Sequence, residues 1–163
     1  RNNILHMTIA PAEVSEDVAK EAHELALRLA QGFELAGILA IELFVTKDER
    51  VIVNELAPRP HNSGHYTIEA CSFDQFDAHI RGIAGWPLEQ PELLKPAVMV
   101  NVLGQHVAPT RALIAEHPEW NMHDYCKAEV RHDRKMGHIT VLTDDTRQTV
   151  ADLERTGCWD DLK

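Results

Sequence analysis

Positively charged residues are scarce in this sequence of 163 residues. Only 16 lysines and arginines accompany 26 aspartates and glutamates, which gives a formal net charge of −10 at pH 7. A protein that binds nucleic acid through broad electrostatic attraction carries the opposite balance. We therefore expect no nucleic-acid partner.

Cysteines and long apolar runs are also few. The three cysteines (Cys71, Cys126 and Cys158) are far apart and form no CxxC pair, so they favour reduced thiols in a cytoplasmic protein over disulfides or structural zinc. No apolar stretch approaches the roughly 20 residues that span a membrane, and no signal peptide is visible, so we expect no membrane partner. The first residue is Arg1. A predicted strand follows almost at once, which indicates that the chain begins inside a larger protein.

The hydrophobic content of 44% is enough for one core with a small appendage. The order of elements predicts an α+β fold, with antiparallel strands and packed helices in 1–90 and a small α/β unit in 97–163. Pro87, Pro91 and Pro96 mark the linker. The predicted strands are 4–9, 37–45, 51–53, 97–103, 127–130 and 138–143. We expect helices after Ser15, after Ser72, where Ser72-x-x-Gln75 has the pattern of a capping box, and after Thr146.

Two apolar runs around residues 46–50 predict an antiparallel hairpin. A turn of two or four residues would place Glu42 directly opposite Glu55, with both side chains on one face and Cβ atoms about 5 Å apart. Two charges at that distance repel by roughly 3 kcal/mol at an effective dielectric of 20, so the pair needs a divalent cation or a bound proton. Carboxylates without thiolates favour Mg²⁺ or Mn²⁺. A turn of three or five residues would instead place the two glutamates on opposite faces.

A polar loop follows the second apolar run, with the sequence Asn54-Glu55-Leu56-Ala57-Pro58-Arg59-Pro60-His61-Asn62-Ser63-Gly64-His65. Charged and polar groups at the end of a buried strand need partners, so this cluster indicates a functional site. The His61-x-x-x-His65 spacing does not favour zinc. That pairing requires one helix face, whereas Asn-Ser-Gly between the histidines is typical of a turn.

A basic segment stands out in the acidic chain near its C-terminus. Its cations are Lys127, Arg131, Arg134 and Lys135. Arginine geometry suits bidentate contact with phosphate, and paired strands around a turn could direct Lys127 and Arg134 into one pocket. A solvated turn is the alternative that spacing alone favours.

The run from Asn54 to Glu69, NELAPRPHNSGHYTIE, closely resembles the signature of the N5-carboxyaminoimidazole ribonucleotide synthetases, ATP-grasp ligases of purine biosynthesis. The resemblance extends to Ile4–Ala12, to Gly37–Asp48 and to Lys127 with Arg134-Lys135-Met136-Gly137-His138, and so covers nearly the whole chain. Many other ATP-grasp enzymes carry Glu-x-Asn-x-Arg where this chain has Ala57 in the place of Asn. The N5-carboxyaminoimidazole ribonucleotide synthetases share this departure, so it favours the resemblance to them over other ATP-grasp enzymes.

The resemblance implies the C-terminal half of an ATP-grasp domain in 1–90 and a small domain with a substrate-phosphate turn in 97–163. The implied reaction is the carboxylation of 5-aminoimidazole ribonucleotide with ATP and bicarbonate. Glu42 and Glu55 would hold Mg²⁺ or Mn²⁺ on the ATP phosphates, Asn54 would lie beside the nucleotide, and Arg59 would stabilise bicarbonate or carboxyphosphate. The residues implied to bind the ribonucleotide are His61, Asn62, Ser63, Gly64, Lys127, Arg134 and Lys135. His65 would either line the ribonucleotide pocket or form hydrogen bonds that support the residues lining it.

Two other readings stay open. The chain could belong to another ATP-grasp ligase that acts on a purine-precursor ribonucleotide, or it could be a non-catalytic interaction fragment. The family's N-terminal part, with its lid and adenine-binding hinge, would precede Arg1. We therefore expect residues 1–163 alone to have negligible ligase activity. A homodimeric parent is compatible with the resemblance.

Overall fold

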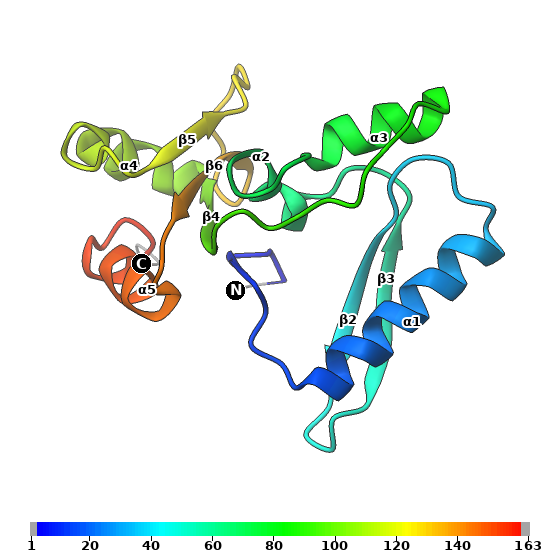
Figure 1. The fold of residues 1–163 in the computed structure, drawn as a ribbon. Coiled ribbons are helices and arrows are strands. Elements are labelled where there is room, and N and C mark those ends of the chain that lie inside the picture. The colour runs from blue at the N-terminus through cyan, green and yellow to red at the C-terminus, as the bar shows by residue number, and fades with distance from the viewer. Residues whose placement is uncertain (1–2, 161–163) are drawn as a thin grey trace. The chain divides into compact units, whose positions relative to one another are not determined.

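The structure, a computed structural model, describes residues 3–160 and divides the chain into two compact units. The hairpin unit comprises Ala12–His65 and Phe73–Glu92, and the sheet unit comprises Arg1–Pro11, Tyr66–Ser72 and Leu93–Lys163. Figure 1 shows the ribbon.

Both units mix helices with antiparallel strands, as the α+β prediction requires. The strands are β1 (Met7–Ala10), β2 (Ala40–Val45), β3 (Val51–Ala57), β4 (Ala97–Leu103), β5 (Asn121–Asp124) and β6 (Lys135–Leu142). The α-helices are α1 (Glu16–Gly32), α2 (Thr67–Ala70), α3 (Gln75–Ala84), α4 (Val107–Leu113) and α5 (Thr146–Arg155). Short 3₁₀ helices are η1 (Asn62–Gly64), η2 (Gly104–His106) and η3 (Ile114–Glu116).

In the hairpin unit, α1 packs along the β2–β3 hairpin (Figure 1). The predicted cap is confirmed, because the Oγ of Ser15 accepts a hydrogen bond of 3.3 Å from the backbone N–H of Val18. Glu16 and Asp17 then occupy the first turn of the helix, where negative charge favours the helix dipole.

The hairpin has the predicted pairing of Glu42 with Glu55, but its turn length differs from the prediction and β3 contains an irregularity. Val45 pairs with Val51, so the turn has the odd length of five residues and by itself would place Glu42 and Glu55 on opposite faces. The register then shifts between Glu42 and Leu43, because β3 carries one extra residue, Asn54, in a β-bulge. Glu42 consequently pairs with Glu55. The expected pairing is confirmed, and the expected even turn is wrong.

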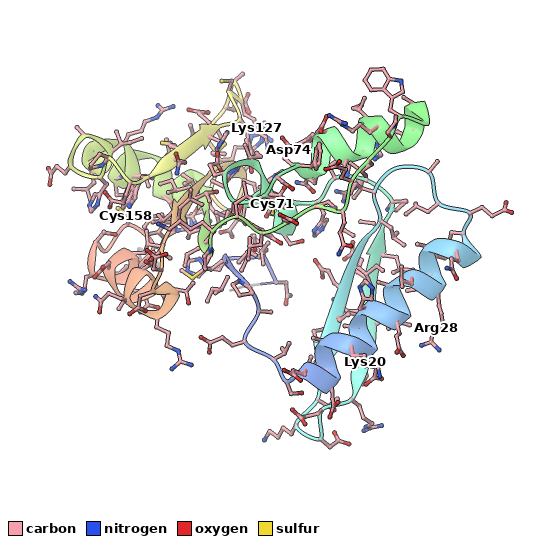
Figure 2. The ribbon with its side chains drawn as sticks, in the orientation of Figure 1. Lys20, Arg28, Cys71, Asp74, Lys127 and Cys158 are labelled. Carbon is pink, nitrogen blue, oxygen red and sulfur yellow. The ribbon has the colours of Figure 1, made fainter. Side chains whose placement is uncertain are left out.

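The start of α3 corrects a second expectation. Its cap is Asp74, whose Oδ1 accepts the backbone N–H groups of Phe76 at 2.7 Å and Asp77 at 2.8 Å (Figure 2). Ser72 is therefore not the cap. Gln75, the second member of the expected capping box, makes contacts elsewhere.

The sheet unit is built on a four-stranded antiparallel sheet of order β1-β4-β6-β5. Every residue of β4 is buried. The apolar core combines β4 and β6 with α5 and the segment that follows it, and its largest members include Trp120, Met136, Ile139, Leu153 and Trp159. The indole Nε1 of Trp159 donates to the backbone carbonyl of Asn101 at 2.9 Å, which ties the segment after α5 to β4.

The predicted strand at 127–130 is wrong. β6 pairs instead with Asn121–Asp124, and the backbone then turns at Cys126, whose φ of 52° lies in the left-handed region. Such a conformation interrupts an extended strand. Lys127 therefore follows β5 in a loop (Figure 2).

The two compact units have boundaries that differ from 1–90 and 97–163, and the division into those two domains stays a prediction. β1 pairs with β4, and α2 contacts β6, so two early segments belong to the sheet unit. The three cysteines are free thiols. Within residues 3–160, no helix combines the length and the apolar character that crossing a membrane would require.

One close approach of backbones holds the basic loop, and it yields a prediction. Gly104 donates its N–H to the carbonyl of Arg134 at 3.0 Å, and a Cβ on Gly104 would overlap the carbonyl oxygen of Arg131. We expect Gly104→Ala to lower the free energy of unfolding by about 1–3 kcal/mol, as overpacking does. Urea denaturation measures the change.

Gly32→Ala is the matched control. Gly32 ends α1, and a Cβ there would meet nothing within 4 Å. This substitution should be neutral or stabilise the protein by about 0.5–1 kcal/mol. Equal effects of the two alanines would show that the contact with Arg131 does not constrain the loop.

Candidate active site

Glu42 and Glu55 meet as cross-strand partners at the bulge of the hairpin unit. The side chain of Glu42 is 39% exposed, and Glu55 is exposed. Both carboxylates therefore remain open to solvent or a ligand. Cross-strand neighbours of like charge destabilise a hairpin, so this pairing does not serve the stability of the hairpin.

Asn54 lies beside the same pair. In a regular strand its side chain would point to the face opposite Glu55, but the bulge turns it, and its Nδ2 donates to Glu42 Oε2 at 3.1 Å. The bulge therefore brings the Asn54 amide to the side of the hairpin that carries the Glu42 carboxylate. A carboxylate oxygen has two lone pairs, so this hydrogen bond orients Glu42 and leaves it able to bind a cation.

The signature loop after β3 is anchored by one buried side chain, Gln75, which is 7% exposed. Its Oε1 accepts the N–H of His61 at 2.8 Å, and its Nε2 donates to the carbonyl of His61 at 2.9 Å. The same Nε2 lies 2.8 Å from Nδ1 of His65, and a Cβ on Gly64 would lie only 2.6 Å from the Oε1. Gln75 therefore fixes both ends of the short η1 helix.

The side chain of His61 faces Glu42. Its Nδ1 accepts the N–H of Ser63 at 3.4 Å and lies 2.9 Å from Ser63 Oγ, which assigns the ring proton to Nε2. That Nε2 lies 3.7 Å from Glu42 Oε1. The His61 side chain is only 12% exposed. The loop therefore presents an N–H group toward one of the two predicted metal-binding carboxylates.

The remaining loop residues have simpler environments. Arg59 is exposed, and its Nη1 donates to the carbonyl of Pro60 at 3.1 Å. The ring of His65 stacks on Phe76 with centroids 5.7 Å apart. His65 thus packs against α3 while Arg59 stays accessible.

Lys127, Arg134 and Lys135 belong to the sheet unit and are half-buried. Lys127 Nζ donates to the carbonyl of Lys135 at 2.6 Å, and Arg134 Nη1 donates to the carbonyl of Glu129 at 3.0 Å. Backbone carbonyls thus hold two of the three cations. The structure places the Lys127 ammonium against the backbone of Lys135, and it brings Glu42, Asn54, Glu55 and His61 together in the hairpin unit.

The loop that carries Lys127 follows Asp124, the last residue of β5, whose pKa lies below its usual value. The backbone N–H of Cys126 is the main cause, and Arg111 adds a second hydrogen bond to the carboxylate. Asp124 and Lys127 both line a cavity of about 400 Å³ in the sheet unit. A fixed carboxylate therefore starts the turn and helps to shape this cavity.

Comparison with known proteins extends these observations over almost the whole chain. Residues 1–76 match the ATP-grasp domain, and residues 97–152 match the phosphoribosylaminoimidazole carboxylase C-terminal domain. An N5-carboxyaminoimidazole ribonucleotide synthase of Staphylococcus aureus (strain COL) is 47% identical over 154 residues, which are 94% of this chain and 41% of that protein.

The chain belongs to this synthase family.

Solved structures of the family agree. The crystal structure of a synthetase in complex with ADP matches 98% of this chain and 42% of its own, with a TM-score of 0.95 and 44% identity. The Aspergillus clavatus synthase in complex with ADP and 5-aminoimidazole ribonucleotide matches 96% of this chain and 44% of its own, with a TM-score of 0.87 and 33% identity. The chain thus spans about two-fifths of the length of these relatives.

Sequence reasoning missed Gln75 as a determinant of the site. The pattern Ser72-x-x-Gln75 suited a capping box, and that pattern by itself does not exclude a contact with a loop ten or more residues away. The signal that could have found it is its place beside Asp74, which is itself a strong cap residue.

The buried role of Gln75 leads to a prediction. Gln75→Leu leaves the N–H and the carbonyl of His61 without their partner, so we expect it to lower the free energy of unfolding by about 2–3 kcal/mol. Gln148→Leu is the control, because Gln148 is exposed in the first turn of α5 and its side-chain amide donates to the exposed Asp152. Urea denaturation of both variants should show a lower free energy of unfolding for Gln75→Leu alone.

Proposed function

We propose that the protein that carries this chain uses ATP and bicarbonate to convert 5-aminoimidazole ribonucleotide into N5-carboxyaminoimidazole ribonucleotide in purine biosynthesis. The observation that carries the proposal is the match over 96% of the chain to a synthase in complex with ADP and this ribonucleotide. The relatives are more than twice as long as the matched region, so we assign the activity to the full protein. Free cysteines fit a cytoplasmic setting. A homodimeric parent stays a prediction.

We assign Mg²⁺, or Mn²⁺, to Glu42 and Glu55. The donor set fits a hard cation, because both ligands are carboxylates and Asn54 orients one of them. When bound, the cation would neutralise negative charge on the ATP phosphates. Among residues 3–160, no cluster of three or more His, Cys, Asp or Glu side chains could hold a metal ion, so phosphate and water would supply the other ligands.

The chain's own residues would position the reactants. Bicarbonate is a poor electrophile, and its phosphorylation by ATP gives carboxyphosphate and ADP. The accessible guanidinium of Arg59 suits this anion, because its planar donors match a carboxylate or phosphate edge. The η1 residues Asn62, Ser63 and Gly64, with His61, would bind the aminoimidazole and ribose, held in place by Gln75.

The 5′-phosphate of the ribonucleotide is assigned to Lys127 and Arg134, with Lys135 beside them. Backbone carbonyls already direct the Lys127 ammonium and the Arg134 guanidinium, so less side-chain freedom is lost on binding. Asn54 would act on the nucleotide indirectly, because it orients Glu42, which would hold the cation on the ATP phosphates.

Substrate-dependent release of ADP tests the proposed reaction. In the full protein with bicarbonate and Mg²⁺, 5-aminoimidazole ribonucleotide should stimulate ADP formation, whereas glycinamide ribonucleotide should not. Stimulation by glycinamide ribonucleotide alone would assign the protein to another ATP-grasp ligase. No stimulation by either nucleotide would refute the proposal.

Neutral variants of the two carboxylates test the cation site. We expect Glu42→Gln and Glu55→Gln each to lower kcat/KM by about 100-fold or more, because each removes a group that stabilises charge in the transition state. Asn54→Ala should lower kcat/KM by about 10–100-fold, which is the effect expected of a residue that orients a metal ligand.

Glu49→Gln is the control, because Glu49 lies in the exposed turn of the same hairpin. It should leave kcat/KM within about twofold of the original value, since a surface substitution away from the core and from the proposed site has a small effect. If Glu42→Gln behaved like Glu49→Gln across a titration of Mg²⁺, the assignment of the cation to this pair would be wrong.

A further inference from the structure

A continuous series of side-chain contacts in the sheet unit runs from α2 to Lys127. We propose that Glu69, His123, His138 and Tyr125 form a positioning network that holds the Lys127 ammonium where it binds the phosphate of a ribonucleotide. This inference rests on the proposed function, because it explains how one substrate-binding residue is held in place.

The network begins with a half-buried carboxylate. The side chain of Glu69 is 14% exposed, and its Oε1 accepts the Nε2–H of His123 at 2.5 Å. Its other oxygen, Oε2, is buried and has no hydrogen-bond partner within residues 3–160. A buried carboxylate that lacks compensation destabilises the fold. His123 is therefore the group that makes this placement of Glu69 tolerable, and Glu69 fixes the orientation of the imidazole.

The orientation of His123 is transmitted across the β5–β6 pair. His123 and His138 are direct cross-strand neighbours, and their rings stack with centroids 4.6 Å apart and planes 14° apart. His138 is 1% exposed, so its ring has little freedom to move. A hydrogen bond of 2.9 Å joins His138 Nδ1 to the hydroxyl of Tyr125. The phenol ring is thus fixed at its polar end by the buried histidine.

Tyr125 in turn meets Lys127. The Lys127 Nζ lies 5.6 Å from the centroid of the Tyr125 ring, within the range of a cation–π contact, and donates to the carbonyl of Lys135. Lys127 lies in a loop, and ordering a long lysine side chain costs rotamer entropy. A ring and a carbonyl that hold the ammonium in advance reduce the loss on binding phosphate.

Binding of ribose 5-phosphate, measured by calorimetry on the full protein, tests the network directly. Glu69→Gln keeps the shape of the side chain but removes its charge, and we expect it to weaken binding about five- to tenfold. Tyr125→Phe keeps the ring over the ammonium and should weaken binding less, by about two- to threefold.

Glu119→Gln is the matched control. Glu119 forms the same kind of pair in the same unit, with its Oε1 2.8 Å from Nδ1 of His117, whose ring stacks on Trp120. This pair does not contact the series that leads to Lys127. Glu119→Gln should leave the dissociation constant for ribose 5-phosphate within about twofold of its value in the unaltered protein.

A double substitution separates positioning from general support of the fold. In a Lys127→Gln background, Glu69→Gln should cause no further loss of binding if it acts through the ammonium. In turnover, Glu69→Gln should raise KM for 5-aminoimidazole ribonucleotide and leave kcat and KM for ATP near their original values.

Three outcomes overturn the inference: equal effects of Glu69→Gln and Glu119→Gln, additive losses in the double variant, or no binding of ribose 5-phosphate by the unaltered protein. The proposed function can fail separately. If ribose 5-phosphate binds with the expected pattern but 5-aminoimidazole ribonucleotide does not stimulate ADP release, the network stands and the assigned reaction falls.

Discussion

The bulge at Asn54 is the constraint on which the hairpin site depends. A five-residue turn sets a register that separates the two acidic side chains, and one extra residue in β3 brings them back to the same face. The bulge also rotates the Asn54 amide onto Glu42. One backbone irregularity therefore places both carboxylates of the proposed metal site and the amide that orients Glu42. Because like charges placed opposite one another oppose pairing, the rest of the hairpin must hold them, and its contacts with α1 provide that support.

A common physical device holds the loops of both units. Loops expose backbone N–H and carbonyl groups, and each such group needs a partner wherever it is buried. In the hairpin unit the amide of Gln75 satisfies both backbone groups of His61. In the sheet unit, Gly104 donates to the carbonyl of Arg134 and Lys127 donates to that of Lys135. The same contacts that satisfy the backbone also aim the side chains assigned to the substrate. Stability and recognition are therefore coupled at these points.

The predictions from sequence succeeded where local chemistry decides the outcome. Ser15 caps α1 as expected, the two apolar runs form a hairpin, and β4 occupies its predicted range. They failed where a residue had two competing uses. Asp74 displaced Ser72 as the cap of α3, because it lies closer to the first turn and accepts two N–H groups. The expected strand at 127–130 was lost to the left-handed turn at Cys126, and the pairing passed to Asn121–Asp124.

The amino-acid order by itself determined the family, the mixed architecture and the identity of the polar groups in the signature loop, because a long contiguous motif and local periodicity are properties of the sequence alone. Only the tertiary structure decided which groups meet. The facing of Glu42 and Glu55 follows from a bulge that local pattern does not mark, and the contact of Glu69 with His123 joins segments more than 50 residues apart. Such contacts depend on how whole elements pack. The reason is that long-range pairing is selected by the total burial and hydrogen bonding of the fold, which no short segment contains.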